Sequence, residues 1–209
     1  MSLHSGIALV PMPTASPRSR PPLAWLRAPG SLTRHLARVC PGRLVVEVLC
    51  EGWAEADPAS ARLLGLRIGA RVWRREVRLS CRHAGEWTPY VHAITLSSPE
   101  AHRMLGLARL GRRPLGSLLF RGGARRLSLE TLPIRRVLDG RPPKGFRPWK
   151  AERSSMRDQR IGTCRMASPK GAAPGGNGPR WARRSLFLLR GHRLLVREDF
   201  LPGLPSFRR

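Results

Sequence analysis

The stretch WARRSLFLLRGHRLLVREDFLP, residues 181–202, decides the fold. It consists of two apolar, strand-like runs that are joined at Gly191-His192, which is the pattern of a β-hairpin. Several other runs of the same kind occur along the chain, joined mainly as hairpins and accompanied by a few short helical segments. The sequence therefore predicts an α+β domain built on an antiparallel sheet.

The last strand of this hairpin places one carboxylate among apolar side chains. Successive side chains of a strand point to opposite faces of a sheet. Glu198 therefore shares a face with three apolar residues, Leu194, Val196 and Phe200. Asp199 shares the other face with Arg197, and we expect it to be a solvated partner of that arginine. Of the two neighbouring acids, Glu198 is the one predicted to point into the core.

An earlier strand carries one inward charge in the same way. In VWRREVRL, residues 72–79, Arg75 shares a face with Trp73, Val77 and Leu79. A bare charge in a core is very costly, so Arg75 and Glu198 each need a partner. Either the two form a buried ion pair, or a strand end brings one of them to solvent, or they line an anion pocket. In the pocket, Arg75 would bind a ligand carboxylate and Glu198 the ligand's other end.

Start signals predict two of the short helices. Ser31 precedes an amphipathic run that begins at Leu32, and Ser98 precedes a proline at the first helical position. The segment RRPLGSLLFRG, residues 112–122, is compatible with a short helix or a strand. His35 and His92 are interpreted as packed core histidines. Further strand-like runs lie at 43–50, 70–81 and 90–97, the last two joined by a longer loop.

Two segments differ in composition from the rest of the chain. Residues 1–22 are rich in Pro and Ser and are expected to form a flexible arm. From about 134 to 179 the chain is basic and rich in Pro and Gly, without a sustained period of 2 or 3.6. We predict a disordered insertion or long loop there. The remainder of 23–209 is predicted to form a single domain.

The formal net charge of +26, from 39 Lys and Arg against 13 Asp and Glu, favours at first sight a nucleic-acid-binding protein. Much of this charge, however, belongs to the irregular segment 134–184. Arg also outnumbers Lys, and Ala, Gly and Pro are abundant, as in proteins from GC-rich coding sequences. We therefore interpret the charge as compositional bias, and keep a nucleic-acid interface only as an alternative.

Neither a metal site nor a membrane span is predicted. No cysteine pair has CxxC spacing or a close histidine, so zinc ligation is not indicated. No run approaches the 18 apolar residues of a membrane span, and the first residues do not match an export signal. We therefore expect a cytoplasmic protein whose cysteines are reduced thiols: Cys40, Cys50, Cys81 and Cys164.

Four motifs carry a family resemblance. LGRRPLGSLLF at 110–120 matches the pattern LG-x-x-PLG-x-x-LF, and EDFLP at 198–202 matches E-x-FLP. GSLTRHL at 30–36 and VWRREVRL at 72–79 resemble an opening motif and a central strand of the same family. The family is that of chorismate pyruvate-lyase (chorismate lyase), and the resemblance covers most of 23–125 and 180–203.

The resemblance implies one antiparallel sheet of about six strands, flanked by short helices that enclose a ligand cavity. The family's substrate-binding positions fall on Leu32, Arg75, Leu115 and Glu198, of which Arg75 and Glu198 would be catalytic. The implied reaction converts chorismate to 4-hydroxybenzoate and pyruvate, which opens ubiquinone biosynthesis and needs no metal or redox cofactor. A monomer is expected.

Two departures from the family pattern are evident. Leu32 stands where Met is common, which reshapes the cavity wall. The insertion at about 134–179 has no counterpart in typical members, and it is compatible with a tolerated loop or with a frameshifted or decayed gene. The alternative to a lyase of this fold is a non-catalytic domain that binds a small carboxylate.

Overall fold

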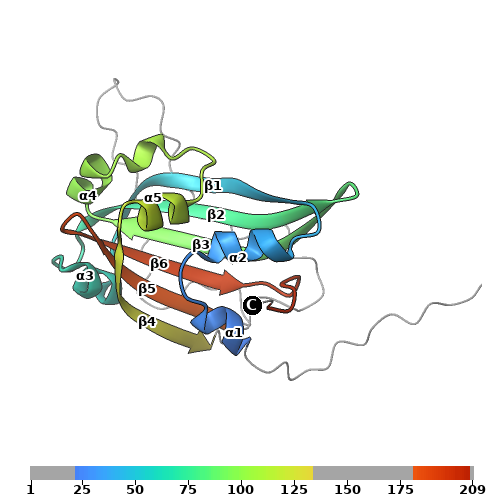
Figure 1. Cartoon of the computed structure of the whole chain (residues 1–209). Coiled ribbons are helices and arrows are strands. Elements are labelled where there is room, and N and C mark those ends of the chain that lie inside the picture. The colour runs from blue at the N-terminus through green and yellow to red at the C-terminus, as the bar shows by residue number, and fades with distance from the viewer. Residues whose placement is uncertain (1–21, 134–180, 208–209) are drawn as a thin grey trace, which may run out of the picture.

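The computed structural model describes residues 22–133 and 181–207 (Figure 1). Its C-terminal part is the predicted hairpin, formed by β5 (Trp181–Leu189) and β6 (His192–Phe200). The turn consists of Arg190 and Gly191, whose φ angles of 49° and 80° suit a two-residue hairpin turn. It lies one residue earlier than predicted. This shift places Arg183, rather than Ser185, opposite Glu198.

The other described strands are β1 (Arg43–Glu55), β2 (Arg71–His83), β3 (Glu86–Ser97) and β4 (Arg125–Pro133). These four strands and the C-terminal hairpin form one antiparallel sheet in the order β1-β2-β3-β6-β5-β4. The N-terminal and C-terminal hairpins join where β3 pairs with β6, so the predicted α+β sheet of about six strands is confirmed. The prediction of a longer loop between the second and third strands is wrong, because Ala84 and Gly85 form a two-residue turn between β2 and β3.

Two of the helices, α2 and α4, begin where the sequence signals predict. Ser31 Oγ accepts a hydrogen bond from the Arg34 amide at 3.3 Å, and Ser98 Oγ accepts one from Ala101 at 3.1 Å. The segment that was compatible with a helix or a strand contains a helix, α5. The elements are α1 (Leu23–Arg27), α2 (Leu32–Val39), α3 (Pro58–Leu64), α4 (Pro99–Met104), the 3-10 helix η1 (Leu107–Arg109) and α5 (Leu115–Arg121).

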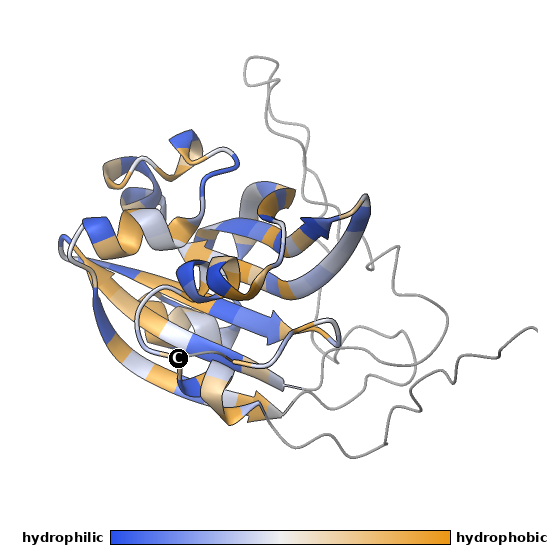
Figure 2. Cartoon of the chain, turned by 45° about the vertical axis from the view of Figure 1, so that its right-hand side comes forward, coloured by the Kyte–Doolittle hydropathy of each residue, from blue (hydrophilic) through white to orange (hydrophobic). Residues whose placement is uncertain are grey.

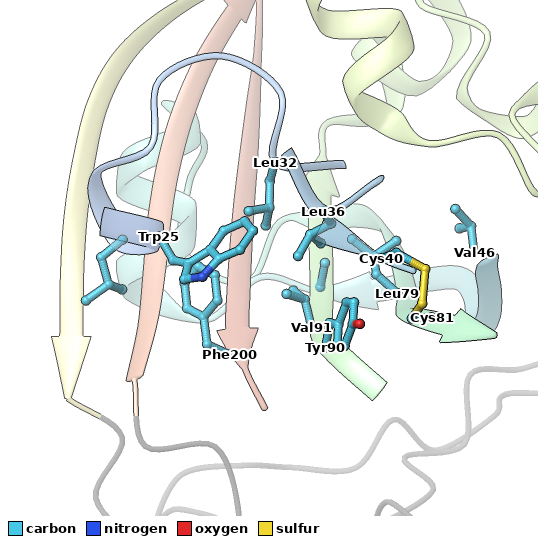
Figure 3. Close-up of a cluster of buried hydrophobic side chains, with 12 residues drawn as sticks. Trp25, Leu32, Leu36, Cys40, Val46, Leu79, Cys81, Tyr90, Val91 and Phe200 are labelled. Carbon is cyan, nitrogen blue, oxygen red and sulfur yellow. A yellow bond between two sulfur atoms is a disulfide. The ribbon is translucent and has the colours of Figure 1, made fainter. Parts of the chain in front are cut away.

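Strand parity divides the core between the two faces of the sheet. Figure 2 shows the alternation of apolar and polar residues along the strands. Leu194 and Val196 pack with residues of α4, η1 and α5, whereas Leu195 packs with α3 on the opposite face. A third cluster joins α1 and α2 to β2, β3 and Phe200 (Figure 3). The face that carries Glu198 is therefore the one covered by α1, α2, α4 and α5.

Two predicted segments lie outside the described residues: the N-terminal arm, apart from residue 22, and the insertion at about 134–179. No helix within 22–133 or 181–207 has the length and hydropathy needed to cross a membrane.

One disulfide ties α2 to the sheet. Cys40 ends α2, and its Cα lies 5.6 Å from that of Cys81 in β2, so the prediction of reduced thiols is wrong for this pair (Figure 3). The reason is tertiary contact, because 41 residues separate the two cysteines in the sequence. The prediction is also wrong for Cys50, which is disulfide-bonded, and Cys164 lies outside the described residues.

Removing this disulfide is expected to destabilise the protein substantially. Closing a loop of this length removes chain entropy from the unfolded state worth about 4 kcal/mol. We expect Cys40→Ala/Cys81→Ala to lower the free energy of unfolding by roughly 3–4 kcal/mol, measured by urea unfolding without reductant. Coincident unfolding curves for the variant and the wild type would contradict this expectation.

Candidate active site

A cavity lies between α2, α5 and the helix-covered face of the sheet. All six strands contribute to its lining, which is mainly apolar with a few charged groups. The four residues singled out from the sequence lie on four different elements: α2, β2, α5 and β6. The structure brings all of them to this one cavity: Leu32, Arg75, Leu115 and Glu198.

Arg75 is held by the loop that precedes α5. Its side chain is buried and pairs with the Glu51 carboxylate of β1. Nη2 donates a hydrogen bond to the carbonyl oxygen of Gly111 at 2.6 Å and contacts that of Arg113 at 3.4 Å. The interpretation that Arg75 and Glu198 form an ion pair with each other is therefore wrong. Each has its own partner, and both line the cavity.

Glu198 is paired with a buried arginine from the neighbouring strand. Arg183 Nε donates to Glu198 Oε2 at 2.5 Å, while Nη1 donates to the carbonyl oxygens of Trp25 and Ala28 at 3.1 and 3.2 Å. Arg183 is 1% exposed, which makes it the largest fully buried side chain of the described residues. Arg183 was not predicted from the sequence. Pairing across a turn at Arg190-Gly191 would have found it, because that turn sets Arg183 opposite Glu198.

Leu32 and Leu115 are the first residues of α2 and α5. The two helix starts approach each other closely at Gly116, where an added Cβ would lie 2.7 Å from Ser31 Oγ. A side chain at this position would displace Ser31 Oγ, which caps α2. The backbone amides at the starts of α2 and α5 are therefore brought together beside the cavity.

The charged groups of the cavity favour an anionic ligand. Three guanidinium groups and one carboxylate line it: Arg75, Arg126, Arg183 and Glu198. Glu51 compensates Arg75, and Glu198 compensates Arg183, so one positive charge remains in excess among the residues that the structure describes. Low-dielectric walls strengthen the attraction of such a charge for an anion. The arrangement can bind a small, carboxylate-bearing molecule between apolar walls.

Asp199, which directly follows Glu198, points to the opposite face of the sheet, as parity predicts. It pairs with Arg197 at 2.7 Å, again as predicted, but it is only 7% exposed. The expectation of a solvated acid is thus wrong. His92 explains the difference: it lies 3.7 Å from Asp199 and 2.7 Å from Glu76. The histidine bridges two carboxylates and so completes a polar cluster on the side of the sheet away from the cavity.

This cluster is expected to make stability fall at alkaline pH. Burial by itself lowers the pKa of His92, but the nearby carboxylate of Asp199 and the hydrogen bond to Glu76 outweigh it and raise the pKa from 6.5 to about 9. The raised pKa contributes stability that is fully present below pH 6.5 and is lost as the pH rises through 9. We expect a loss of roughly 2–3 kcal/mol across this window, measured by urea unfolding at several pH values.

His92→Gln is the matched control, because it removes the titrating group. Its unfolding free energy should not change between pH 6.5 and 9 through this cause. An equal change of unfolding free energy with pH in wild type and His92→Gln above pH 6.5 would contradict the assignment of this effect to His92.

Glu76 affects stability at the acidic end of the pH scale. Burial would raise its pKa, but hydrogen bonds from His92 and Arg74 lower it from 4.5 to about 2. Its contribution is therefore present above pH 4.5 and is lost as the pH falls toward 2.

Comparison with known proteins identifies relatives along most of the chain. A family model described as chorismate lyase matches residues 15–208. A probable chorismate pyruvate-lyase of Aromatoleum aromaticum is 35% identical over 198 residues, covering 93% of this chain and 90% of the relative. A probable chorismate pyruvate-lyase of Methylococcus capsulatus is 36% identical over 185 residues, covering 88% and 96%.

Among solved structures, PhnF from Mycobacterium smegmatis superposes with a TM-score of 0.50 at 14% identity, covering 86% of this chain and 67% of that one. At this level of identity, the likeness concerns the fold alone.

Proposed function

Because the chain belongs to the chorismate lyase family, we propose that it eliminates pyruvate from chorismate to give 4-hydroxybenzoate. This reaction would be the first committed step of ubiquinone biosynthesis. The observation that carries the proposal is the cavity in which Arg75 and Glu198, from strands separated by β3, meet with the starts of α2 and α5. Residues 23–209 would act as one monomeric domain, with 134–179 as an insertion.

The proposed reaction asks the protein for positioning and electrostatic stabilisation. The ether bond between the ring and the enolpyruvyl group breaks, a ring hydrogen leaves as a proton, and the departing group takes up a proton to become pyruvate. Aromatisation of the ring provides the driving force, so neither a metal nor a redox cofactor enters the balance. Fixed charges in a cavity with apolar walls act more strongly than they would in water.

Each of the four residues has a role in this proposal. Arg75, fixed by Glu51 and by the loop before α5, binds the ring carboxylate. The backbone amides at Leu32 and Leu115 add donors to the same anion, and the two side chains form apolar wall. Glu198, held by Arg183, accepts a hydrogen bond from the ring hydroxyl. A substrate held at both ends is thereby oriented for loss of the enolpyruvyl group.

A turnover assay tests the proposal. Purified full-length protein is incubated with chorismate without added metal or cofactor, and the products are separated by chromatography. We expect equal amounts of 4-hydroxybenzoate and pyruvate to form well above the spontaneous rate. Binding of chorismate without turnover would instead support a non-catalytic carboxylate-binding domain. Absence of both binding and turnover would refute the assignment of this cavity to chorismate.

A further inference from the structure

Arg126 differs from the other two arginines of the cavity. It lies on β4, at the edge of the sheet, and its guanidinium lies 5.1 Å from the ring centre of Phe187. Its one hydrogen bond to another described residue is weak, from Nη2 to the carbonyl oxygen of Gly30 at 3.4 Å. Nε is buried, and no described residue accepts a hydrogen bond from it. Within 22–133 and 181–207, no carboxylate pairs with Arg126.

Among the described residues, Arg126 lacks the carboxylate partner that Arg75 and Arg183 each have. Burial lowers the pKa of Arg126, and the positive charge of Arg183 lowers it further, whereas Glu198 acts in the opposite direction. The half-buried guanidinium has no counter-charge among the described residues, and its buried, unpaired Nε–H adds a desolvation cost. An anionic ligand group in the cavity would supply both the missing charge and the missing acceptor.

The surroundings of Arg126 place this anion near Glu198. Arg183 donates to the carbonyl oxygen of Ala28 and Arg126 to that of Gly30, so both guanidinium groups reach the loop between α1 and α2. Arg183 also holds Glu198. In sheet order Glu198 therefore stands between Arg75 on one side and Arg126 on the other.

We propose that Arg126 binds the second carboxylate of chorismate, the one carried by the enolpyruvyl group that leaves as pyruvate; this inference rests on the proposed function. The ether-bearing ring carbon is adjacent to the carbon that bears the hydroxyl. With the ring carboxylate at Arg75 and the hydroxyl at Glu198, the enolpyruvyl group lies at the Glu198 end of the cavity, within the reach of an arginine on β4. Arg126 thus recognises the part of the substrate that the product 4-hydroxybenzoate lacks.

Comparison of two ligands tests the inference. Arg126→Gln is expected to raise the KM for chorismate by about 10- to 100-fold, the loss of a charge-assisted hydrogen bond. The same variant should bind 4-hydroxybenzoate within about twofold of wild type, because that molecule has no second carboxylate. Arg126→Lys should recover part of the loss. Arg125→Gln is the matched control, since Arg125 is exposed and adjacent strand residues point to opposite faces.

The outcomes separate this inference from the proposed function. Equal weakening of both ligands would show that Arg126 only shapes the cavity, and unchanged affinity for chorismate would show that it does not bind the substrate; either result overturns the inference. Failure of the proposed function would appear instead in the wild type, as an absence of turnover. In that case the two-ligand comparison still decides the inference, with dissociation constants measured by calorimetry in place of KM.

Discussion

Replacing Arg75 with alanine is expected to lower kcat/KM for chorismate by about 100- to 1,000-fold, which corresponds to roughly 3–4 kcal/mol of transition-state stabilisation. The side chain is buried, so its interaction with a carboxylate is little weakened by water. Its orientation is fixed before any ligand binds, because Glu51 and the Gly111 carbonyl hold the guanidinium. Steady-state kinetics with chorismate measure the effect.

Two further variants separate binding from folding. Arg78→Ala removes an arginine from the same strand, but from an ion pair with Glu47 that is more than a third exposed on both sides, and it should leave kcat/KM within about twofold of wild type. Arg75→Ala leaves Glu51 without its partner, which destabilises the protein. Arg75→Ala/Glu51→Gln should regain stability without regaining turnover. Turnover restored in this double variant would mean that Arg75 has a structural role only.

Replacing Glu198 with glutamine is expected to lower kcat by about 100-fold or more, with a smaller change in KM. Glutamine has nearly the same shape, but it lacks the negative charge that accepts a strong hydrogen bond and neutralises Arg183. The effect should therefore appear in the chemical step rather than in the filling of the cavity. Single-turnover kinetics with saturating chorismate measure this step directly.

Asp199→Asn provides the control at the neighbouring position. Asp199 is as buried as a site residue, but it faces His92 and Arg197 on the other side of the sheet. We expect this variant to lose stability while its kcat stays within about twofold of wild type, since Asp199 is not one of the residues that line the cavity. Similar losses of kcat in Glu198→Gln and Asp199→Asn would contradict the proposed role of Glu198.

Two of the four residues of the candidate site could be predicted from the alternation of side chains along the strands. Glu198 and Arg75 could each be assigned to the core-facing side because the side chains of a strand alternate strictly between the two faces of the sheet. Both side chains do line the cavity on that face. Family motifs added Leu32 and Leu115, which parity cannot reach because they begin helices. All four line one cavity, although their functional roles stay a prediction.

Other features depended on information that local patterns do not contain. Arg183 was missed because its partner is set by the hairpin register, and the turn lies one residue before its predicted place. Arg126 was missed because RRLSLETLP, residues 125–133, has too few apolar residues to be recognised as a strand; it is an edge strand that pairs only with β5. The Cys40–Cys81 disulfide depends on how α2 packs against β2, which no spacing rule predicts.

The side chain of Arg183 also has a consequence for when the protein can fold. It joins the backbone at Trp25 and Ala28 to Glu198, and Trp25 Nε1 in turn donates to the carbonyl oxygen of Pro205 at 2.7 Å, 180 residues away in sequence. Contacts of such long range form slowly, and none of these can form until the C-terminal hairpin has been synthesised. The lining of the cavity is therefore complete only after translation has passed Glu198, and a nascent chain arrested earlier leaves Trp25 and Ala28 without these partners.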